Sequence, residues 1–224
     1  MYQIVGLPIL LKVFGWSVVA LAVLIVAISA LIEVPAGWGW AKAVFSAAGT
    51  GIAIASGTVA LLGSGKIFPW CCRQRWSCGV FPDLAGEWVG ELRSNWPRIS
   101  ARGADGVGDI DLLVRPARAT ITANLLTVCM ELATDDRYSI SRTFTTGVER
   151  DGTTGEVTIS YLYENTTLAP KSTDVSTHQG AAKLTLRREG DDLVLEGPYW
   201  TNRAWNLGLN TAGVACFRKV TKAA

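Results

Sequence analysis

The sequence has little of the chemistry on which most enzymes depend. Its 224 residues include a single histidine, His178. It contains no GxSxG nucleophile elbow, no HExxH zinc motif and no phosphate-binding loop. A zinc site needs about four ligands, but the cluster of Cys71, Cys72 and Cys78 lies about 100 residues before His178. The sequence therefore predicts no catalytic residue, no metal and no cofactor, and hence a protein that is not an enzyme.

Charge is also scarce, and its distribution is uneven. Charged residues make up 18% of the chain, and none occurs from Val13 to Ile32 or from Ala43 to Gly65. Residues 83–224 contain 16 Lys and Arg against 18 Asp and Glu, so this part is close to neutral. Non-specific binding of nucleic acid depends on a basic surface. We therefore expect no binding of DNA or RNA, and a nucleotide ligand would need a pocket.

The two uncharged stretches predict a pair of membrane-spanning helices. Each is long enough to cross a hydrocarbon core of about 30 Å, which takes about 20 residues. The link between them contains Pro35, which interrupts a helix, and Trp38 and Trp40, which favour the water–lipid boundary. A cleaved signal peptide has an apolar core of only about 7–15 residues, and a buried core helix normally has a polar face. Two spans fit the pattern better than either alternative.

Basic residues outside this hairpin predict its orientation. Lys12 precedes the first span, and Lys66, Arg73 and Arg75 follow the second, whereas the link contains only Lys42. By the positive-inside rule, both termini then lie in the cytoplasm. We expect a two-span membrane region over residues 1–67, a juxtamembrane linker over 68–82 and a cytoplasmic domain over 83–224.

Small residues recur at every fourth position of the second span. Ala43, Ala47, Gly51 and Ala55 therefore share one face of the helix. Lipid provides no hydrophobic drive for association, so helices in a membrane associate where small residues let their backbones approach closely. This predicts oligomerisation through Ala47, Gly51 and Ala55. Packing of the same face against the first span of the same chain is an alternative, and the two are compatible.

From Asp83 onward, alternating apolar and polar residues replace the long apolar runs. The pattern predicts short strands separated by turns such as Asp151-Gly152 and Gly190-Asp191. No amphipathic helix is predicted after the membrane region, and Cys129 and Cys216 are expected to be buried in strands. Short strands without helices predict an all-β, roughly eight-stranded antiparallel β-barrel, which can hold one small ligand. The runs 109–115 and 117–121 can form one strand interrupted by Pro116, which gives roughly eight strands. The predicted runs are 84–95, 109–115, 117–121, 125–133, 139–148, 156–164, 181–188, 192–200 and 211–220.

Three segments of this domain place aromatic, hydroxyl and small residues on one face of a strand. They run from Gly86 to Trp96, from Tyr161 to Asn165 and from Gly197 to Arg203. Aromatic rings stack on nucleobases, while arginine, hydroxyl and amide groups bind phosphate and base edges. Each segment alone fits ordinary barrel packing, but together they predict a ligand pocket. The candidate ligand-binding residues are Ser94, Trp96, Tyr161, Tyr163, Asn165, Tyr199, Thr201 and Arg203.

Two spans followed by a β-rich domain with these motifs resemble a known family. The chain is similar to the SMODS-associating two-transmembrane, β-strand-rich effectors of cyclic-oligonucleotide-based anti-phage signalling systems (CBASS), also called transmembrane β-barrel effectors. The resemblance rests on five short motifs, each weak alone, whose order behind two spans is more specific. These are Leu84-x-Gly86-x-Trp88-x-Gly90, Ser139-x-Ser141, Tyr161-x-Tyr163-x-Asn165, His178-x-Gly180 and Leu195-x-Gly197-x-Tyr199-x-Thr201-x-Arg203.

The resemblance implies a function in the bacterial inner membrane. A partner nucleotidyltransferase would make a cyclic dinucleotide or a related cyclic oligonucleotide, the barrel would bind this second messenger in the cytoplasm, and the spans would self-associate in the bilayer and disrupt it, which kills the infected cell. Trp200 departs from the small aromatic residue usual in the last motif. Two alternatives remain from the residues themselves: a lipocalin-like, membrane-anchored barrel that binds an apolar small molecule, and an interaction domain with a fully packed core.

Overall fold

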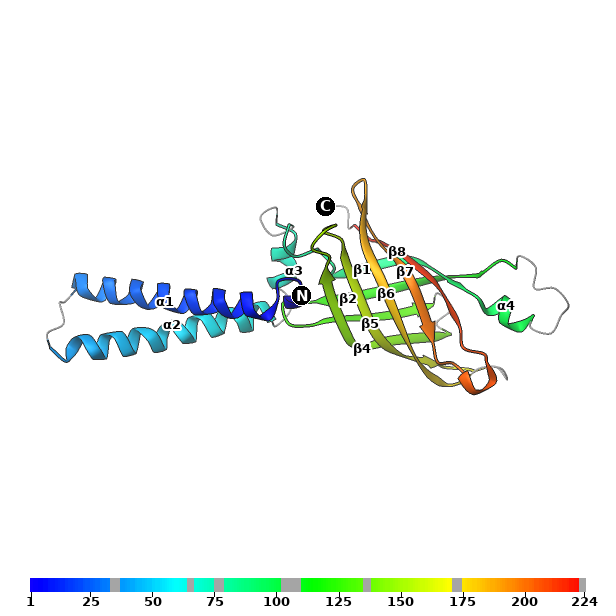
Figure 1. Cartoon of the computed structure of the whole chain (residues 1–224), viewed down its shortest axis with the longest axis horizontal. Coiled ribbons are helices and arrows are strands. Elements are labelled where there is room, and N and C mark those ends of the chain that lie inside the picture. Colours follow the sequence, from blue (N-terminus) through cyan, green and yellow to red (C-terminus); the bar gives the residue numbers. More distant parts are fainter. Residues whose placement is uncertain are drawn as a thin grey trace. The chain divides into compact units, whose positions relative to one another are not determined.

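A computed structural model of the chain describes residues 1–32, 37–63, 67–74, 79–101, 110–134, 138–170 and 175–221. The chain divides into two compact units, of which the first comprises Met1–Phe81 with Asn124–Leu126 and the second Pro82–Ala123 with Thr127–Ala224. The first unit is helical and the second is a β-barrel (Figure 1). This confirms the predicted architecture of two long apolar helices followed by an all-β domain.

Two helices dominate the first unit, α1 (Leu7–Ile32) and α2 (Gly39–Gly63), and both are long and apolar enough to cross a membrane. No residue of α1 is buried. Large apolar side chains such as Val23 and Leu31 are exposed, as helices in lipid require and as soluble surfaces avoid. The hydroxyls of Ser17, Ser29 and Thr58 donate to the carbonyl four residues earlier, so they need no water. Part of the predicted link, residues 33–36, lies outside the described residues.

The predicted small-residue face of α2 packs against α1 of the same chain. Ala47, Gly51 and Ala55 are the buried residues of α2. A Cβ atom added at Gly51 would lie 3.0 Å from the backbone oxygen of Val18 in α1, so the glycine sets how closely the two helices approach. The intrachain alternative therefore holds for this face. Self-association through the same residues stays a prediction.

The segment expected to be a linker contains a short helix, α3 (Ile67–Cys72). A further turn of 3₁₀-helix, η1 (Tyr2–Ile4), lies before α1 at the start of the chain. Phe68 and Cys72 of α3 are buried, and the Phe68 ring packs edge-on against Phe81 with ring centroids 5.2 Å apart. Aromatic packing thus gives order to part of a stretch that the sequence left irregular. Cys78, the third cysteine of the predicted cluster, lies outside the described residues.

The second unit is a closed barrel of eight antiparallel strands in sequential order, in which β1 pairs with both β2 and β8. Because the barrel closes, no strand edge is left unpaired for aggregation. The strands are β1 (Gly86–Ser94), β2 (Leu113–Ala123), β3 (Val128–Thr134), β4 (Ser139–Arg150), β5 (Val157–Thr167), β6 (Thr177–Glu189), β7 (Asp192–Thr201) and β8 (Ala212–Lys219).

Two features differ from the strand pattern predicted by the sequence. The runs on either side of Pro116 form the single strand β2, because β3 pairs with β2 only from Ala117 onward and so requires no N–H at the proline. Two short helices that the sequence did not predict follow strands, α4 (Trp96–Ser100) and the 3₁₀-helix η2 (Trp205–Leu207). The glycine-rich stretch Gly103–Gly108 and the turn Asp135–Asp136 lie outside the described residues.

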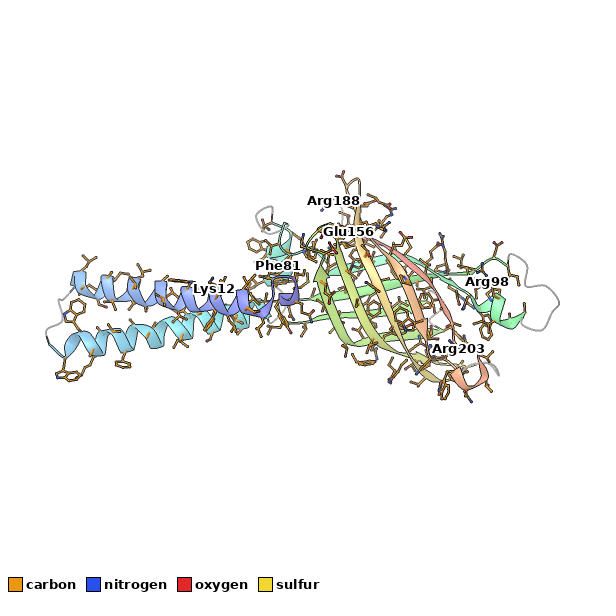
Figure 2. The ribbon with its side chains drawn as sticks, viewed as in Figure 1. Lys12, Phe81, Arg98, Glu156, Arg188 and Arg203 are labelled. Atoms are coloured by element: carbon orange, nitrogen blue, oxygen red, sulfur yellow. The ribbon has the colours of Figure 1, made fainter. Side chains whose placement is uncertain are left out.

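One end of the barrel is filled by side chains, and we call it the packed end. Trp88, Leu195 and Phe217 are fully buried there, and the Trp88 indole donates to the Leu84 carbonyl at 3.0 Å. Lys219 forms an ion pair of 2.7 Å with Asp83 near the Trp88 ring. Glu156 and Arg188 in Figure 2 mark this end. The opposite end, where β1, β3, β5 and β7 finish, we call the open end.

Candidate ligand-binding site

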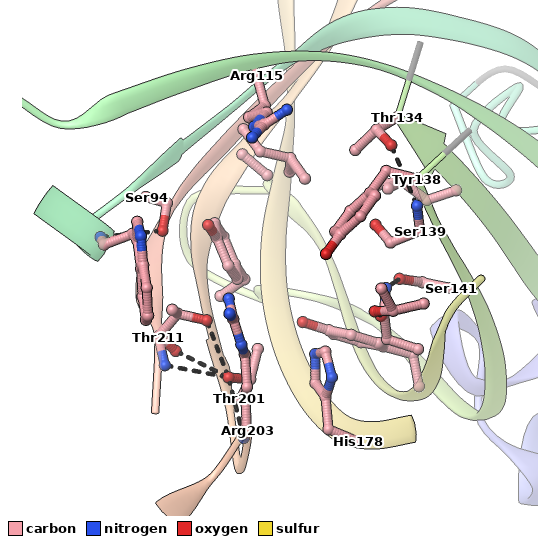
Figure 3. A pocket seen from close by; sticks show the side chains of 18 of the residues that line it. Ser94, Arg115, Thr134, Tyr138, Ser139, Ser141, His178, Thr201, Arg203 and Thr211 are labelled. Carbon is pink, nitrogen blue, oxygen red and sulfur yellow. Dashed lines mark hydrogen bonds between the residues drawn. The ribbon is translucent and has the colours of Figure 1, made fainter. Parts of the chain in front are cut away.

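The open end of the barrel encloses a cavity of about 280 Å³, close to the lower limit of small-molecule sites. Each of the eight strands contributes at least one residue to the cavity lining, β6 through His178 and β8 through Ala215. Figure 3 shows these side chains converging from opposite walls. The lining residues are Leu92, Ser94, Trp96, Leu113, Arg115, Met130, Leu132, Thr134, Tyr138, Ser139, Ser141, Thr143, Tyr161, Tyr163, Asn165, Thr167, His178, Tyr199, Thr201, Arg203, Thr211 and Ala215.

Two tyrosines of β5 form the inner boundary of the cavity. The rings of Tyr161 and Tyr163 lie 5.9 Å apart between centroids, inclined at 48°. Tyr163 lies opposite Gly180 of β6, where an added Cβ atom would approach the tyrosine ring to 2.4 Å. Only glycine leaves room for this ring. The small residue on β6 thus positions an aromatic face on β5.

The tyrosine phenols at this boundary are protonated. Burial raises the pKa of Tyr161, and burial raises the pKa of Tyr163 with a further contribution from Tyr161 and Tyr199. Burial also raises the pKa of Tyr199, against which a hydrogen bond with Ser94 acts in the opposite direction. All three therefore keep their O–H groups at neutral pH, and they can donate hydrogen bonds to an anionic or carbonyl acceptor.

Hydroxyl and amide groups form two hydrogen-bonded clusters on the walls. Asn165 donates from Nδ2 to the Ser141 hydroxyl at 2.8 Å, which links β5 to β4. On the other side, the hydroxyls of Thr201 and Thr211 lie 3.0 Å apart, and the Thr211 N–H donates to Thr201 Oγ1 at 3.1 Å. These bonds fix the rotamers of polar groups whose other donors and acceptors face the cavity.

Arg203 reaches the cavity from the loop after β7 and not from the strand itself. β7 ends at Thr201, and Asn202 fastens the loop to β6 through two hydrogen bonds with Gln179, of 2.8 and 2.7 Å. The next residue, Ala204, has a φ of 40°, a left-handed conformation that is rare for alanine and turns the chain after the arginine. The predicted strand 192–200 thus ends close to its expected position, and the extended conformation does not continue to Arg203, although Arg203 still lines the cavity.

The helix α4 brings Trp96 against Arg203. The Ser94 hydroxyl accepts the Trp96 N–H at 3.2 Å at the point where β1 gives way to the helix. The Arg203 guanidinium carbon lies 4.5 Å from the centroid of the Trp96 ring, within the range of a cation–π contact. The tryptophan ring therefore packs against the guanidinium group and helps to hold the arginine side chain at the cavity.

The charge of the described lining is positive. Arg115 lies at the rim on β2, and Arg203 lies on the opposite side. His178 lies on β6, and Figure 3 shows all three side chains at the cavity. Among the described residues, no Asp or Glu lines the cavity. An anion entering here meets two guanidinium groups and no carboxylate, so the site suits an anionic ligand with flat, aromatic parts.

All eight residues predicted for ligand binding line this one cavity. Their role in binding stays a prediction. Sequence reasoning did not include Arg115, Tyr138, Thr143 or Thr211. Arg115 was recognisable, because it alternates in phase with the inward-facing Ala117, Ala119 and Ile121, whereas the β4 bulge near Thr143 and the loop before Thr211 have no clear sequence pattern.

More than half of the lining residues are polar or charged. A lipocalin-like site for an apolar molecule was expected to have mainly aliphatic walls, so the lining disfavours that alternative. The cavity itself is inconsistent with a fully packed interaction domain. In the described part of the chain, no three His, Cys, Asp or Glu residues are grouped as metal ligands.

A closed antiparallel barrel with a polar, arginine-lined cavity, preceded by two helices apolar enough for a membrane, defines a membrane-associated ligand-binding barrel. Residues 80–215 match the family described as Cap15, cyclic dinucleotide receptor domain, and the chain belongs to this family. It is 28% identical over 136 residues to CD-NTase-associated protein 15 of Escherichia albertii. The match covers 59% of this chain and 60% of that relative's length. These findings confirm the family resemblance seen in the sequence.

Proposed function

We propose that the chain is a non-enzymatic effector of CBASS anti-phage defence whose barrel binds a cyclic dinucleotide at the open end. The observation that carries this proposal is the cavity with two arginines, three neutral tyrosines and no described carboxylate. Membership of a family described as a cyclic dinucleotide receptor domain supports it. The name of the related CD-NTase-associated protein supports a functional link to a nucleotidyltransferase that makes the signal.

A cyclic dinucleotide matches the chemistry of this cavity. It has two phosphodiesters, each with one negative charge, and two flat bases. Arg115 and Arg203 on opposite sides of the rim suit the two charges, since guanidinium groups bind phosphate oxygens in pairs. Tyr161, Tyr163 and Trp96 offer aromatic faces for bases, and each stacked base contributes about 1–3 kcal/mol.

The membrane helices would convert binding into cell death. In this proposal both termini and the barrel are cytoplasmic, α1 and α2 cross the inner membrane, and ligand binding leads these helices to assemble and disrupt the bilayer. Gly51→Ile would separate α2 from α1, because an added Cβ already meets the Val18 oxygen at 3.0 Å. We expect this variant to suppress toxicity while ligand binding is retained. Full toxicity at normal expression would exclude this helix face from the mechanism.

Orientation has an independent test in reporter fusions. Fluorescent protein at the C-terminus should be bright and alkaline phosphatase at the same position inactive, because phosphatase folds only outside the cytoplasm. Active phosphatase with a dark fluorescent protein would place the barrel outside the cytoplasm and exclude a cytoplasmic signal.

Binding is tested directly by calorimetry on the full chain in detergent with a panel of cyclic dinucleotides. Linear dinucleotides of the same bases are the matched control, because they share the bases but not the fixed spacing of the two phosphates. At 100 times its dissociation constant a ligand stabilises the folded protein by about 2.7 kcal/mol, so the melting temperature should rise with the cognate compound. No binding by any cyclic nucleotide, with a folded barrel, would overturn the proposal.

A further inference from the structure

The cavity at the open end is too small to enclose a whole cyclic dinucleotide. Its volume is about 280 Å³, whereas pockets that bury most of a drug-sized molecule have volumes of about 300–1,000 Å³. A cyclic dinucleotide contains two complete nucleotides and is at least as large as such a molecule. When the barrel binds this ligand as proposed above, about one half of it therefore enters the cavity and the other half stays at the mouth.

Burial separates the lining residues into an inner part and a mouth. Tyr163 and Asn165 belong to the inner part and are 8% and 7% exposed. Trp96 and Arg203 are partly exposed, and Arg115 is exposed, so these three residues form the mouth. Charged phosphates lose most by leaving water and gain most beside guanidinium groups, so they stay at the mouth. The part of the ligand that reaches the inner part is therefore a base.

Asn165 is the one amide side chain in the described lining of the cavity. Its Nδ2 donates to the Ser141 hydroxyl at 2.8 Å, and its Oδ1 accepts from Thr167 Oγ1 at 3.4 Å. These bonds hold the plane of the amide and leave one N–H and one lone pair without a partner among the described residues. Hydroxyl groups rotate to suit either role, whereas this donor and this acceptor have fixed positions. Such a pair matches the edge of one base and is left unpaired by another.

The mouth offers a base a flat surface instead of a fixed donor and acceptor. The Arg203 guanidinium carbon lies 4.5 Å from the centroid of the Trp96 ring, and Figure 3 shows Arg203 and Ser141 on different walls of the cavity. Every base has a π-face, so stacking on an aromatic ring tolerates any base. In the proposed function Arg115 and Arg203 bind the phosphates, and no Asn, Gln, Asp or Glu accompanies them among the described residues of the mouth. A base at the mouth is therefore held but not identified.

We propose that the site reads only one of the two bases of its ligand and that Asn165 is the specificity-determining residue. This inference rests on the proposed function. The inner base pairs through its edge with the Asn165 amide, and the outer base stacks at Trp96 and Arg203 whatever its identity. The ligand class is then any cyclic dinucleotide that contains at least one cognate base, whether its two bases are equal or different.

Calorimetry on the full chain in detergent tests how many bases are read. The probes are the symmetric cyclic dinucleotides of adenine, guanine, cytosine and uracil, and mixed compounds that join the best of these bases to each of the others through the same linkage. We expect the cognate symmetric compound to bind at least about 100-fold more tightly than the other symmetric compounds, because a wrong edge leaves buried polar atoms unpaired. Each mixed compound should bind within about threefold of the cognate one, since it loses only one of two equivalent orientations.

The mixed compounds distinguish the reading of one base from the reading of two. If both bases were read independently, their contributions to the binding free energy would add, and a mixed compound would bind at least about tenfold more weakly than the cognate symmetric one. That result would overturn the inference, as would equal affinities of all symmetric compounds, and both results would leave the proposed function intact. A folded chain that binds none of the compounds would overturn the proposed function and the inference with it.

Substitutions at the two parts of the cavity test the role of Asn165. Asn165→Ala should lower the affinity ratio between the cognate and the other symmetric compounds from at least about 100-fold to below about tenfold, because no unpaired amide then penalises a wrong base. Trp96→Ala is the matched control, and it should weaken the binding of every compound by at least about fivefold while the ratio stays within about twofold. Asn165→Thr retains a hydroxyl group for Ser141 and replaces the alanine variant if that variant does not fold. An unchanged ratio in a folded Asn165 variant would overturn the assignment of this residue.

Discussion

The packed end and the open end of the barrel are built from the same eight strands, yet their interiors differ in kind. On β1 the inward positions change from Trp88 at the packed end to Ser94 at the open end, and on β5 they change from Ile159 to Asn165. Burial at the packed end removes apolar surface from water at about 25 cal/mol per Å². At the open end the same inward direction presents polar groups, which gain little from burial. Stability therefore comes mainly from the packed end, and the proposed recognition of a ligand is assigned to the open end.

The connections between strands follow the same division. At the packed end β6 and β7 are joined by Gly190 and Asp191 alone, and β4 and β5 by residues 151–156. At the open end β1 and β2 are separated by residues 95–112, and β7 and β8 by 202–211. Long loops on a rigid scaffold are where binding residues are usually found. The connections at the open end provide Trp96, Tyr138 and Arg203, so the longer connections of the barrel contribute to the cavity lining.

The largest effect is expected from removing the core of the packed end. Trp88→Ala should lower the free energy of unfolding by about 3–5 kcal/mol, because it empties a fully buried site and removes the indole hydrogen bond to Leu84. Trp205→Ala is the matched control, since Trp205 is 73% exposed. Thermal and denaturant unfolding of the full chain in detergent measures both. Equal, small losses would mean that the packed end does not dominate stability.

A smaller effect, and on binding, is expected at the open end. Arg203→Ala should weaken the affinity for the cognate cyclic dinucleotide by about 10- to 150-fold, because a charge-assisted hydrogen bond contributes about 1.5–3 kcal/mol. Some stability is also lost with the Trp96 contact, about 0.5–1 kcal/mol. Calorimetric affinity and melting temperature are measured together.

Arg218→Ala provides the control for Arg203→Ala. Arg218 is exposed on the outside of the barrel and forms ion pairs with Glu189 and Asp192. We expect unchanged affinity in this variant. If Arg203→Ala retains full affinity, the cavity residues around it do not bind the ligand, and if it loses its cooperative unfolding, Arg203 belongs to the structure of the open end.

The sequence predicted the features that depend on periodicity. Alternation identified seven of the strands near their observed positions, and it placed Tyr161, Tyr163 and Asn165 on one face because β5 is regular throughout its length. The same rule was misapplied to Cys129, which was expected to be buried. Val128 and Met130 point inward, so alternation places Cys129 outward, and it is exposed.

Features that depend on tertiary contacts were beyond the sequence. Trp96 was selected as the residue that follows the predicted strand 84–95, but no helix was predicted there, and it begins α4, a helix too short to show periodicity. Arg203 was placed correctly at the cavity for a wrong reason, since the strand ends two residues earlier and the left-handed Ala204 sets the direction of the loop. A backbone conformation of this kind is decided by its surroundings and not by local propensity.

Gly180→Ala should reduce binding by disturbing the inner boundary of the cavity. The new Cβ would meet the Tyr163 ring at 2.4 Å and the Trp200 backbone oxygen at 2.7 Å, so the ring must move into the cavity. Overpacking costs about 1–3 kcal/mol, which corresponds to a loss of affinity of about 5- to 150-fold if the ligand occupies the space that the ring enters. Gly147→Ala is the control, because its Cβ would meet only the Ser160 oxygen, at 3.8 Å. Equal affinities in the two variants would separate the ligand from Tyr163.

The smallest effect should come from removing the hydrogen bond between Asn165 and Ser141. Its removal tests whether these polar groups of the open end stabilise the fold or bind the ligand. Asn165→Ala and Ser141→Ala should each lower the free energy of unfolding by about 0.5–1.5 kcal/mol, and the double variant should lose less than the sum, since the partners share one bond of 2.8 Å. If a bound nucleotide also uses these groups, each variant loses affinity by about 3- to 10-fold beyond its loss of stability. A double-mutant cycle in unfolding and in calorimetry separates the two roles. Coupling in unfolding without any change in affinity would assign this pair to the fold. The ligand-binding part of the cavity would then be limited to the region near Arg203.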